Sequence, residues 1–249
     1  MTYCVAMCLR DGLIFASDSR TNAGVDHIST FRKMHIFEKA GDRSIVLLNS
    51  GNLATTQSVI SLLRSRCLHE GASLLSVTSV YDAAALVGET IREVLKRDTG
   101  GATMAQGVDF SCSFLVGGQI RGESPRLFNV YPQGNFIEAT TDTPFFQIGE
   151  SKYGKPIFDR VVRFETSLNE ALKCTLISFD STIKSNLSVG LPIDLLKMPE
   201  GQFGQVKPFR VDDSNDYFQN IRRAWGEGLR RVFAEIPDAE WFDELNRSG

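Results

Sequence analysis

Histidine is scarce in this chain. His27, His35 and His69 are its three histidines, and each stands apart from the others. A Ser-His-Asp or Cys-His catalytic group needs a histidine that works with a nucleophile, so neither arrangement has much to build on. The sequence also lacks a Gly-rich loop ending in Lys-Ser or Lys-Thr, the kind that binds nucleotide phosphates. Any ATP-driven step would therefore belong to a separate ATPase partner.

Cysteine is too sparse and too scattered to organise the fold. The five cysteines are odd in number and lie mostly in apolar stretches, as expected of small reduced core residues: Cys4, Cys8, Cys67, Cys112 and Cys174. Cys4 and Cys8 share one face of a strand, but no second pair or histidine cluster completes a metal site. We expect no metal and no cofactor.

Long apolar runs and an excess of one charge are also missing. No stretch approaches the roughly 18 apolar residues of a membrane span, and the first residues lack the basic-then-apolar pattern of a secretion signal. The 27 basic and 30 acidic residues are mixed along the chain, so no basic stripe favours nucleic acid. We expect a cytoplasmic protein whose 249 residues form a single domain, without membrane or nucleic-acid partners.

The first 37 residues are typical of three strands joined by turns. The pattern predicts strands over 3–9, 13–17 and 30–37, with Arg10-Asp11-Gly12 as the first turn. If these strands pair in order, Asp18 and Lys33 converge on Thr2.

The rest of the chain alternates between strands and helix pairs. An apolar strand over 44–48 leads through Gly51 into an amphipathic helix over 53–69, for which Asn52 can cap the N-terminus. Further predicted elements are helices over 81–96, 156–162, 168–184 and 215–235, and strands over 110–116, 126–131, from 136, over 187–196 and over 207–211, with Gly117-Gly118 as a turn region. This order predicts an α+β layered sandwich with two sheets face to face.

The segment 236–249 carries an apolar cluster around Trp241 and Phe242. An exposed cluster of this kind is typical of an interface between subunits. The alternative is that both rings fold back onto their own domain.

The chemistry depends on Thr2. A threonine hydroxyl needs a base, and the chain's own α-amine would serve once Met1 is removed. A small residue at position 2 is compatible with that removal. An α-amine has an ordinary pKa of about 7.7–8.0, near working pH. Lys33 would favour the ionised hydroxyl, and Asp18 would hold that lysine charged and oriented.

Two further residues complete this hypothesis. The backbone N–H of Gly51, between a strand and a helix, is suited to donate to an oxyanion, and Ser151 would support the amine by a hydrogen bond. Taken singly, each residue has an ordinary structural interpretation, such as a turn residue or a solvated charge. The combination is what favours catalysis.

At these residues the chain resembles a known family. Thr2, Asp18-Ser19-Arg20-x-x-Ala23-Gly24, Lys33 and Ser50-Gly51 resemble the catalytic half of proteasome β-type subunits, which are N-terminal-nucleophile hydrolases. The segments 2–5, 19–34 and 148–156 resemble more closely the bacterial ancestral β subunit group, Anbu.

The resemblance implies a four-layer αββα sandwich and a threonine peptidase. It implies a homo-oligomer and a peptide substrate. For Anbu this oligomer is an open helical ring, and the alternative is a closed ring. It assigns Thr2 as nucleophile, Asp18 and Lys33 as a charge pair, and Gly51 as oxyanion donor. It also implies a substrate pocket lined by Thr21, Phe31, His35, Asn49 and Leu53.

The chain departs from the proteasome pattern at three places. Gly149-Glu150-Ser151 replaces Gly-Ser-Gly, and Asn22 stands where a threonine usually binds the substrate backbone. The later Asp-x-x-Ser-Gly support is replaced within 180–186 by residues of suitable type. Two other functions therefore stay open: a weak or inactive scaffold or assembly subunit, and a hydrolase of small amides with the same N-terminal chemistry.

Overall fold

The computed structural model describes residues 2–22, 28–99, 109–204 and 206–242 of the chain. The chain divides into two compact units, residues 1–213 and 214–249, which are described separately. The expectation that 1–249 forms one domain stays a prediction.

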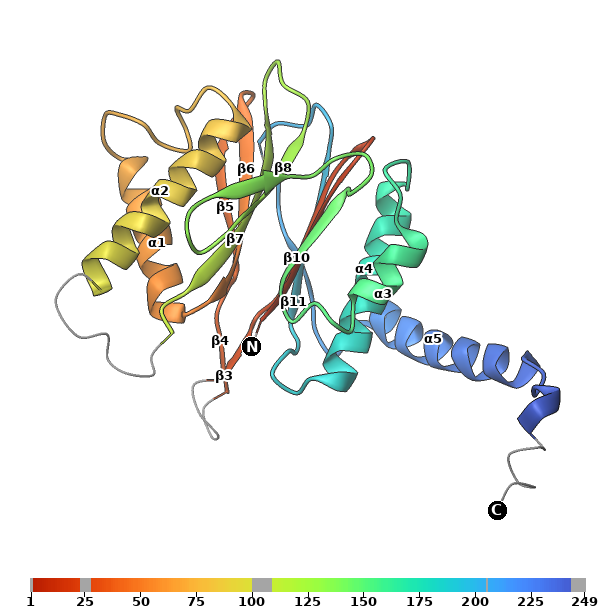
Figure 1. The fold of residues 1–249 in the computed structure, drawn as a ribbon. Coiled ribbons are helices and arrows are strands. Elements are labelled where there is room, and N and C mark those ends of the chain that lie inside the picture. The colour runs from red at the N-terminus through yellow and green to blue at the C-terminus, as the bar shows by residue number, and fades with distance from the viewer. Residues whose placement is uncertain (1, 23–27, 100–108, 205, 243–249) are drawn as a thin grey trace. The chain divides into compact units, whose positions relative to one another are not determined.

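The first unit is built on two antiparallel five-stranded sheets that lie face to face (Figure 1). One sheet has the order β10-β1-β2-β11-β12, the other has the order β5-β6-β7-β8-β9, and β3 pairs with β4 as a separate ribbon. The strands are β1 (Tyr3–Leu9), β2 (Gly12–Asp18), β3 (Arg20–Asn22), β4 (Ile28–Thr30), β5 (Met34–Lys39), β6 (Arg43–Gly51), β7 (Cys112–Ile120), β8 (Arg126–Val130), β9 (Phe136–Glu138), β10 (Phe145–Gly149), β11 (Ile193–Pro199) and β12 (Phe209–Val211).

Each sheet is covered on its outer face by two helices. Helices α1 (Leu53–Arg66) and α2 (Val80–Thr99) cover the β5–β9 sheet, and α3 (Lys155–Val161) and α4 (Leu168–Ser185) cover the other (Figure 1). The fold is therefore the α+β, four-layer αββα sandwich that the sequence predicts.

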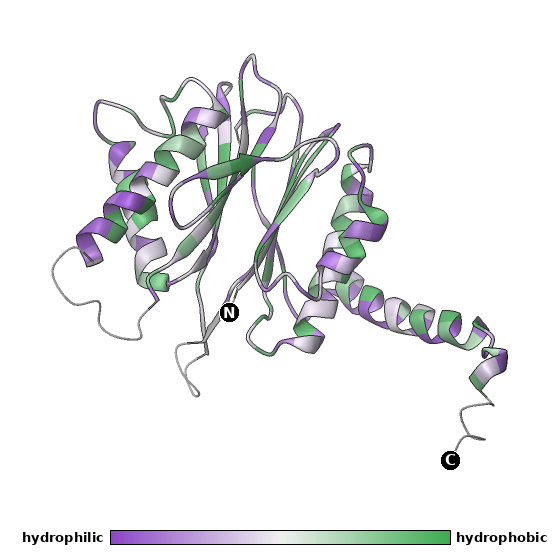
Figure 2. Cartoon of the chain, in the orientation of Figure 1, coloured by the Kyte–Doolittle hydropathy of each residue, from purple (hydrophilic) through white to green (hydrophobic). Residues whose placement is uncertain are grey.

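The core follows from these layers, because the central strands of both sheets carry buried apolar residues. Figure 2 marks hydrophobic residues along the strands of both sheets. Along β1, Cys4 and Ala6 point between the sheets. Tyr3 points the other way, and its ring lies 4.6 Å from that of Phe179 on α4. A strand buried on both faces reads as a continuous apolar run, which is why 3–9 and 13–16 are apolar throughout.

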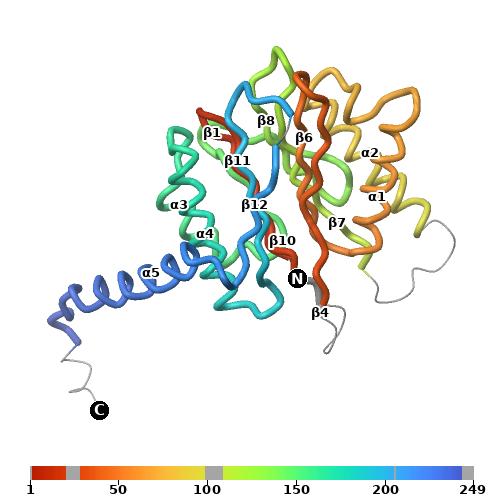
Figure 3. Tube along the Cα trace, turned by 180° about the vertical axis from the view of Figure 1, so that it is seen from behind, coloured from red at the N-terminus to blue at the C-terminus, as the bar shows by residue number. Residues whose placement is uncertain are grey.

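The third predicted strand is wrong in its extent and its partner. Strand β4 pairs with β3, and β5 begins only at Met34 and pairs with β6 in the opposite sheet. The second neighbour of β2 is β11, which pairs in turn with β12. Figure 3 shows β11 and β12 from behind. Between β4 and β5 the Phe31 amide donates to the Ser19 carbonyl (2.9 Å), and the Asn49 amide donates to the Lys33 carbonyl (3.1 Å). Residues 31–33 thus carry the chain from the β3–β4 ribbon to the second sheet.

The predicted turn at Gly117-Gly118 is also wrong, because β7 runs through both residues. A Cβ at Gly117 would lie 2.8 Å from the Phe15 ring across the sandwich, and one at Gly118 would lie 2.4 Å from the Ser44 carbonyl oxygen. These glycines serve close packing rather than a turn. The predicted strand over 187–196 is shorter as well, since β11 starts at Ile193.

The second unit contains α5 (Asp216–Glu235) and a short 3-10 helix, η1 (Glu240–Phe242). Asn215 caps α5, since its side chain accepts from the Phe218 amide at 2.9 Å. The unit exposes large apolar side chains, listed with their exposed fractions: Leu229 53%, Val232 50%, Phe233 80%, Ile236 64%, Trp241 56% and Phe242 44%. Among the described residues, no helix has the length and apolar character needed to cross a membrane.

Candidate active site

The β1–β2 hairpin brings Asp18 next to the first described residues. Cys4 lies opposite Ser17 in this register, so Asp18 falls beside Tyr3, whose amide donates to Asp18 Oδ1 at 2.9 Å. Thr2 precedes β1 directly and is half-buried. The register that follows from the tight turn before Gly12 therefore places the Asp18 carboxylate close to Thr2.

Lys33 forms a buried ion pair with this carboxylate. Its Nζ lies 2.7 Å from Asp18 Oδ1 and 2.7 Å from the Arg20 carbonyl oxygen. Burial raises the pKa of Asp18, whereas the charge of Lys33, its hydrogen bond and the amides of Tyr3 and Gly190 oppose that rise. An ammonium group has three N–H donors. The bonds from Lys33 to Asp18 and to the Arg20 carbonyl use two of them, so one remains for a group in the adjacent cavity.

Residues far along the chain hold Thr2 in place. The Glu150 amide donates to the Thr2 carbonyl at 2.7 Å. Gly149 has φ +81°, and a Cβ there would lie 2.0 Å from the Thr2 carbonyl oxygen, so only glycine fits. The Asn186 side chain in turn donates to Glu150 Oε2 at 2.9 Å. From the sequence, residues 180–186 were only a possible replacement for the Asp-x-x-Ser-Gly support. No local pattern predicts the contact between Asn186 and Glu150.

Gly51 ends β6 where the chain turns into α1. It has φ +107°, and a Cβ would lie 2.4 Å from the Ser111 carbonyl oxygen. The Asn52 amide donates to that same oxygen at 2.9 Å, and the Asn52 side chain caps α1 by accepting from the Thr55 amide at 3.2 Å. The predicted strand–glycine–helix junction thus has the local structure that its residues favour.

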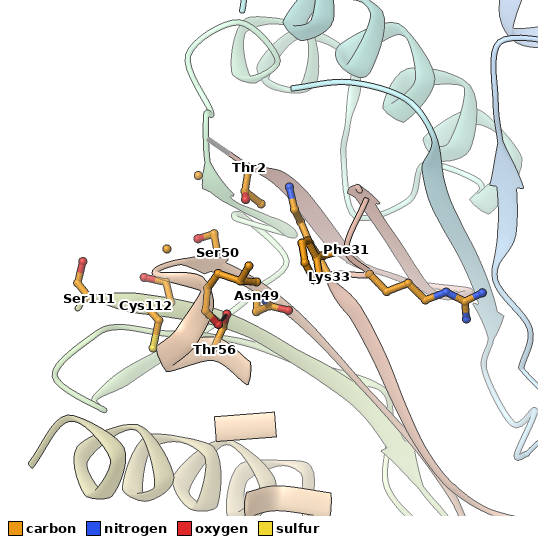
Figure 4. A pocket seen from close by; sticks show the side chains of 13 residues that line it. Thr2, Phe31, Lys33, Asn49, Ser50, Thr56, Ser111 and Cys112 are labelled. Carbon is orange, nitrogen blue, oxygen red and sulfur yellow. Dashed lines mark hydrogen bonds between the residues drawn. The ribbon is translucent and has the colours of Figure 1, made fainter. Parts of the chain in front are cut away.

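These elements surround a cavity of about 470 Å³ (Figure 4). Lys33 reaches toward Thr2 at one side of the cavity. Of the predicted site residues, the cavity brings together Thr2, Phe31, Lys33, Asn49, Gly51 and Leu53. The cavity is also lined by residues that the sequence did not assign to the site: Arg32, Ser50, Thr56, Ser111, Cys112, Ser113 and Gly149.

Three further residues that the sequence assigns to the site are Ser151, Thr21 and Asn22. Ser151 does not line this cavity; its carbonyl accepts from the Lys155 amide at 3.0 Å, at the start of α3. Its proposed support of the amine stays a prediction. Thr21 and Asn22 belong to β3, but their side chains lie outside what the structure describes.

Cysteine is a poor candidate nucleophile here. All five cysteines lie in the described ranges as free thiols. Cys112 is the one that lines the cavity, and burial raises its pKa to about 12. Since the thiolate is the reactive form, Cys112 stays protonated and inert at neutral pH.

His35 lines a second cavity of about 300 Å³, which shares Phe31, Arg32, Asn49, Leu53 and Thr56 with the first. Its Nε2 lies 3.0 Å from Asn49 Oδ1. Because an amide oxygen only accepts, Nε2 carries the proton and donates. Burial lowers the pKa of His35 to about 4, against a smaller opposing effect of the Asn49 hydrogen bond. The ring is therefore neutral at physiological pH.

Acidification is expected to destabilise the wild-type protein more than a His35→Gln variant. Between an ordinary pKa of 6.5 and a folded pKa of about 4, the unfolded chain binds a proton that the folded chain excludes. This contribution to stability is present above pH 6.5 and is lost as pH falls toward 4, by up to about 3 kcal/mol. Glutamine does not titrate and keeps a donor for Asn49. Urea unfolding at pH 7 and pH 4 measures the loss in each protein, and the effects of the carboxyl groups, which both proteins share, cancel in the difference. An equal loss in both proteins would contradict the assignment.

Two stacked antiparallel sheets between helix pairs, with a Thr-Asp-Lys site at one edge of the sandwich, define the class of proteasome-like N-terminal-nucleophile hydrolase folds. A model of the proteasome subunit family matches residues 2–195. The chain belongs to this family and, within it, to the Anbu (ancestral β-subunit) group.

Solved Anbu structures from three bacteria are similar to this chain over most of its length. The protein from Pseudomonas aeruginosa, solved as a helical assembly, is 57% identical with a TM-score of 0.92, covering 96% of this chain and 98% of its own. That from Yersinia bercovieri is 58% identical with a TM-score of 0.90 (96% and 99%). That from Hyphomicrobium sp. strain MC1 is 48% identical with a TM-score of 0.88 (96% and 100%). No curated protein matches.

Proposed function

We propose that this chain is a threonine-type endopeptidase in which Thr2, exposed as the N-terminal residue by removal of Met1, attacks peptide carbonyls. The observation that carries the proposal is the cavity shared by Thr2, Lys33 and Gly51, with Lys33 held 2.7 Å from Asp18. Membership of the proteasome family supports the same chemistry.

In the first half of the reaction the α-amine of Thr2 takes the hydroxyl proton as Oγ bonds to the substrate carbonyl carbon. The carbonyl electrons move onto oxygen, where the Gly51 N–H donates to the oxyanion. The C–N bond then breaks, and the ammonium returns its proton to the leaving amine. This leaves an ester on Thr2.

In the second half water attacks the ester, the amine takes the water proton, and Oγ regains a proton as the acid product leaves. Lys33 favours the developing negative charge on Oγ and the unprotonated amine throughout. Asp18 keeps Lys33 charged and oriented. No step needs a metal or a cofactor.

The working form is proposed to be a cytoplasmic homo-oligomer, an open helical ring or a ring. The helical assembly of the Pseudomonas aeruginosa relative supports this. Trp241 and Phe242, whose rings meet edge-on at 4.6 Å and are both exposed, are proposed as an inter-subunit contact within 236–249. Residues 243–249 of that segment lie outside the described residues. Unfolding of a protein substrate would require a separate ATPase or operon partner.

Mass spectrometry of the purified protein tests the proposal. We expect an intact mass lighter by one methionine residue, and a further gain of one inhibitor mass after treatment with a peptide epoxyketone, which needs both the hydroxyl and the free amine. The same peptide with its epoxide opened to a diol is the control and should add nothing. A retained Met1 in the working oligomer would favour the scaffold alternative. A trimmed protein that forms the adduct but cleaves only small amides would favour the amidase.

A further inference from the structure

The cavity at Thr2 continues along one face of α1. The second cavity shares five lining residues with the first and is also lined by Gln57, Ile60, Ser61 and Arg64. Leu53, Gln57, Ile60 and Arg64 follow one another at intervals of three or four residues, so they form one stripe of the helix. The stripe starts beside Gly51 and ends at Arg64.

Positive charge collects in this extension. Arg32 and Arg64 line the second cavity, and no acidic residue in the described part of the chain lines either it or the first cavity. A third cavity of about 540 Å³ shares Arg32, His35 and Arg64 with the second and adds Asp194 and Arg210.

Among the residues that the structure describes, no carboxylate neighbour neutralises Arg32 or Arg64. Asp194 is engaged by Arg210 through two hydrogen bonds of 2.8 and 3.0 Å. Across the described ranges, Arg32 and Arg64 have no carboxylate within 4 Å. The extension therefore keeps two uncompensated positive charges.

Several neutral side chains line the second cavity between Leu53 and Arg64. Phe31, Leu53 and Ile60 supply apolar surface, and His35 is uncharged at physiological pH because burial lowers its pKa. Gln57 and Ser61 offer polar groups between these walls and Arg64. A pocket with an apolar neck and a cationic end fits a side chain with methylene groups and a terminal carboxylate.

We propose that the peptidase prefers glutamate over neutral and basic residues immediately before the scissile bond, with Arg64 and Arg32 as the specificity-determining residues. The inference rests on the proposed function, because it takes Thr2 as the origin of the pocket. Arg64 lies about 16 Å from Leu53 along the helix axis at 1.5 Å per residue, and its side chain leans back toward the helix N-terminus. The longer glutamate side chain reaches farther along this stripe than aspartate does.

Matched fluorogenic peptides test the preference. The substrates carry Glu, Gln or Lys before the cleaved bond and are otherwise identical. Because Gln is the neutral isostere of Glu, comparing these two measures the effect of side-chain charge alone. We expect kcat/KM for Glu to exceed that for Gln by about fivefold to tenfold, because both arginines are exposed and an exposed ion pair contributes modestly. The ratio should fall toward one in 1 M salt, which screens such pairs.

Variants assign the effect to residues. Arg64→Gln and Arg32→Gln are each expected to lower the Glu-to-Gln ratio, and Arg64→Glu to favour the Lys substrate. Arg66→Gln is the matched control: Arg66 lies on the same helix, bonds to Thr90 and Glu93, and lines none of the three cavities. It should leave the ratio unchanged.

Failure of the specificity inference is distinguishable from failure of the proposed function. Equal cleavage of the Glu and Gln peptides would overturn the specificity while leaving the peptidase in place. If no peptide is cleaved, calorimetric binding of the same peptides to Thr2→Ala protein decides. Tighter binding of the Glu peptide, lost in Thr2→Ala/Arg64→Gln, would uphold an anion-selective pocket, and equal binding would end the inference.

Discussion

Replacing Thr2 by alanine is expected to reduce kcat/KM for peptide cleavage by at least about four orders of magnitude, which is the scale of removing a nucleophile. Alanine is small enough to permit removal of Met1, so the amine stays free and only the hydroxyl is lost. The fold should persist, because the Thr2 side chain supplies no core packing and its carbonyl still accepts from the Glu150 amide. Hydrolysis of a fluorogenic peptide by the purified protein measures the loss.

Thr2→Ser is the control for this experiment. Serine keeps the hydroxyl and the amine, so measurable cleavage and an epoxyketone adduct are expected. Activity of Thr2→Ala equal to that of the wild type would assign the cleavage to another group or to a contaminating protease. The melting temperatures of the two variants should agree, because neither change alters the contacts of the Thr2 backbone.

Breaking the Asp18–Lys33 pair is the second change with a large expected effect. Asp18→Asn leaves the Lys33 ammonium buried without its counter-ion, and Lys33→Met leaves the Asp18 carboxylate in the same position. Each single change is expected to cost about 3–5 kcal/mol of unfolding free energy and to abolish peptide cleavage. Urea denaturation and peptide hydrolysis on the same samples separate stability from catalysis.

The double variant Asp18→Asn/Lys33→Met sharpens this prediction. It removes both charges, so we expect it to recover much of the lost stability while remaining inactive. Activity in the double variant would show that the pair serves the fold alone. Lys155→Met is the matched surface control: Lys155 lies 2.6 Å from Asp159, but its side chain is 58% exposed. Its change should stay within about 0.5 kcal/mol, with activity unchanged.

Much of the first 18 residues follows from local rules. The apolar runs on either side of Arg10-Asp11-Gly12 form a hairpin, and its two-residue periodicity aligns Asp18 with the start of β1. In the same way the strand before Gly51 and the cap at Asn52 have a short-range explanation. The proximity of Asp18 to Thr2 was therefore predictable from the sequence.

Lys33 reaches this site by a route that periodicity does not show. A single strand over 30–37 paired with β2 is the simplest interpretation of its alternation, yet β5 belongs to the opposite sheet. The break at residues 31–33 depends on hydrogen bonds to Ser19 and Asn49, which lie in different elements. The predicted meeting of Asp18 and Lys33 holds, but the pairing of strands in order that was offered to explain it is wrong.

By itself the sequence determined the layers of the sandwich, the hairpin and the capped helix after Gly51, and through them the residues worth testing as nucleophile, charge pair and oxyanion donor. Only the tertiary structure decided what surrounds Thr2: the Gly149–Glu150 support, its contact with Asn186, and the two arginines, Arg32 and Arg64, that line the second cavity. The physical reason is range. Strand alternation, turns and caps act over a few residues, whereas these contacts join segments that become neighbours only when the two sheets pack together.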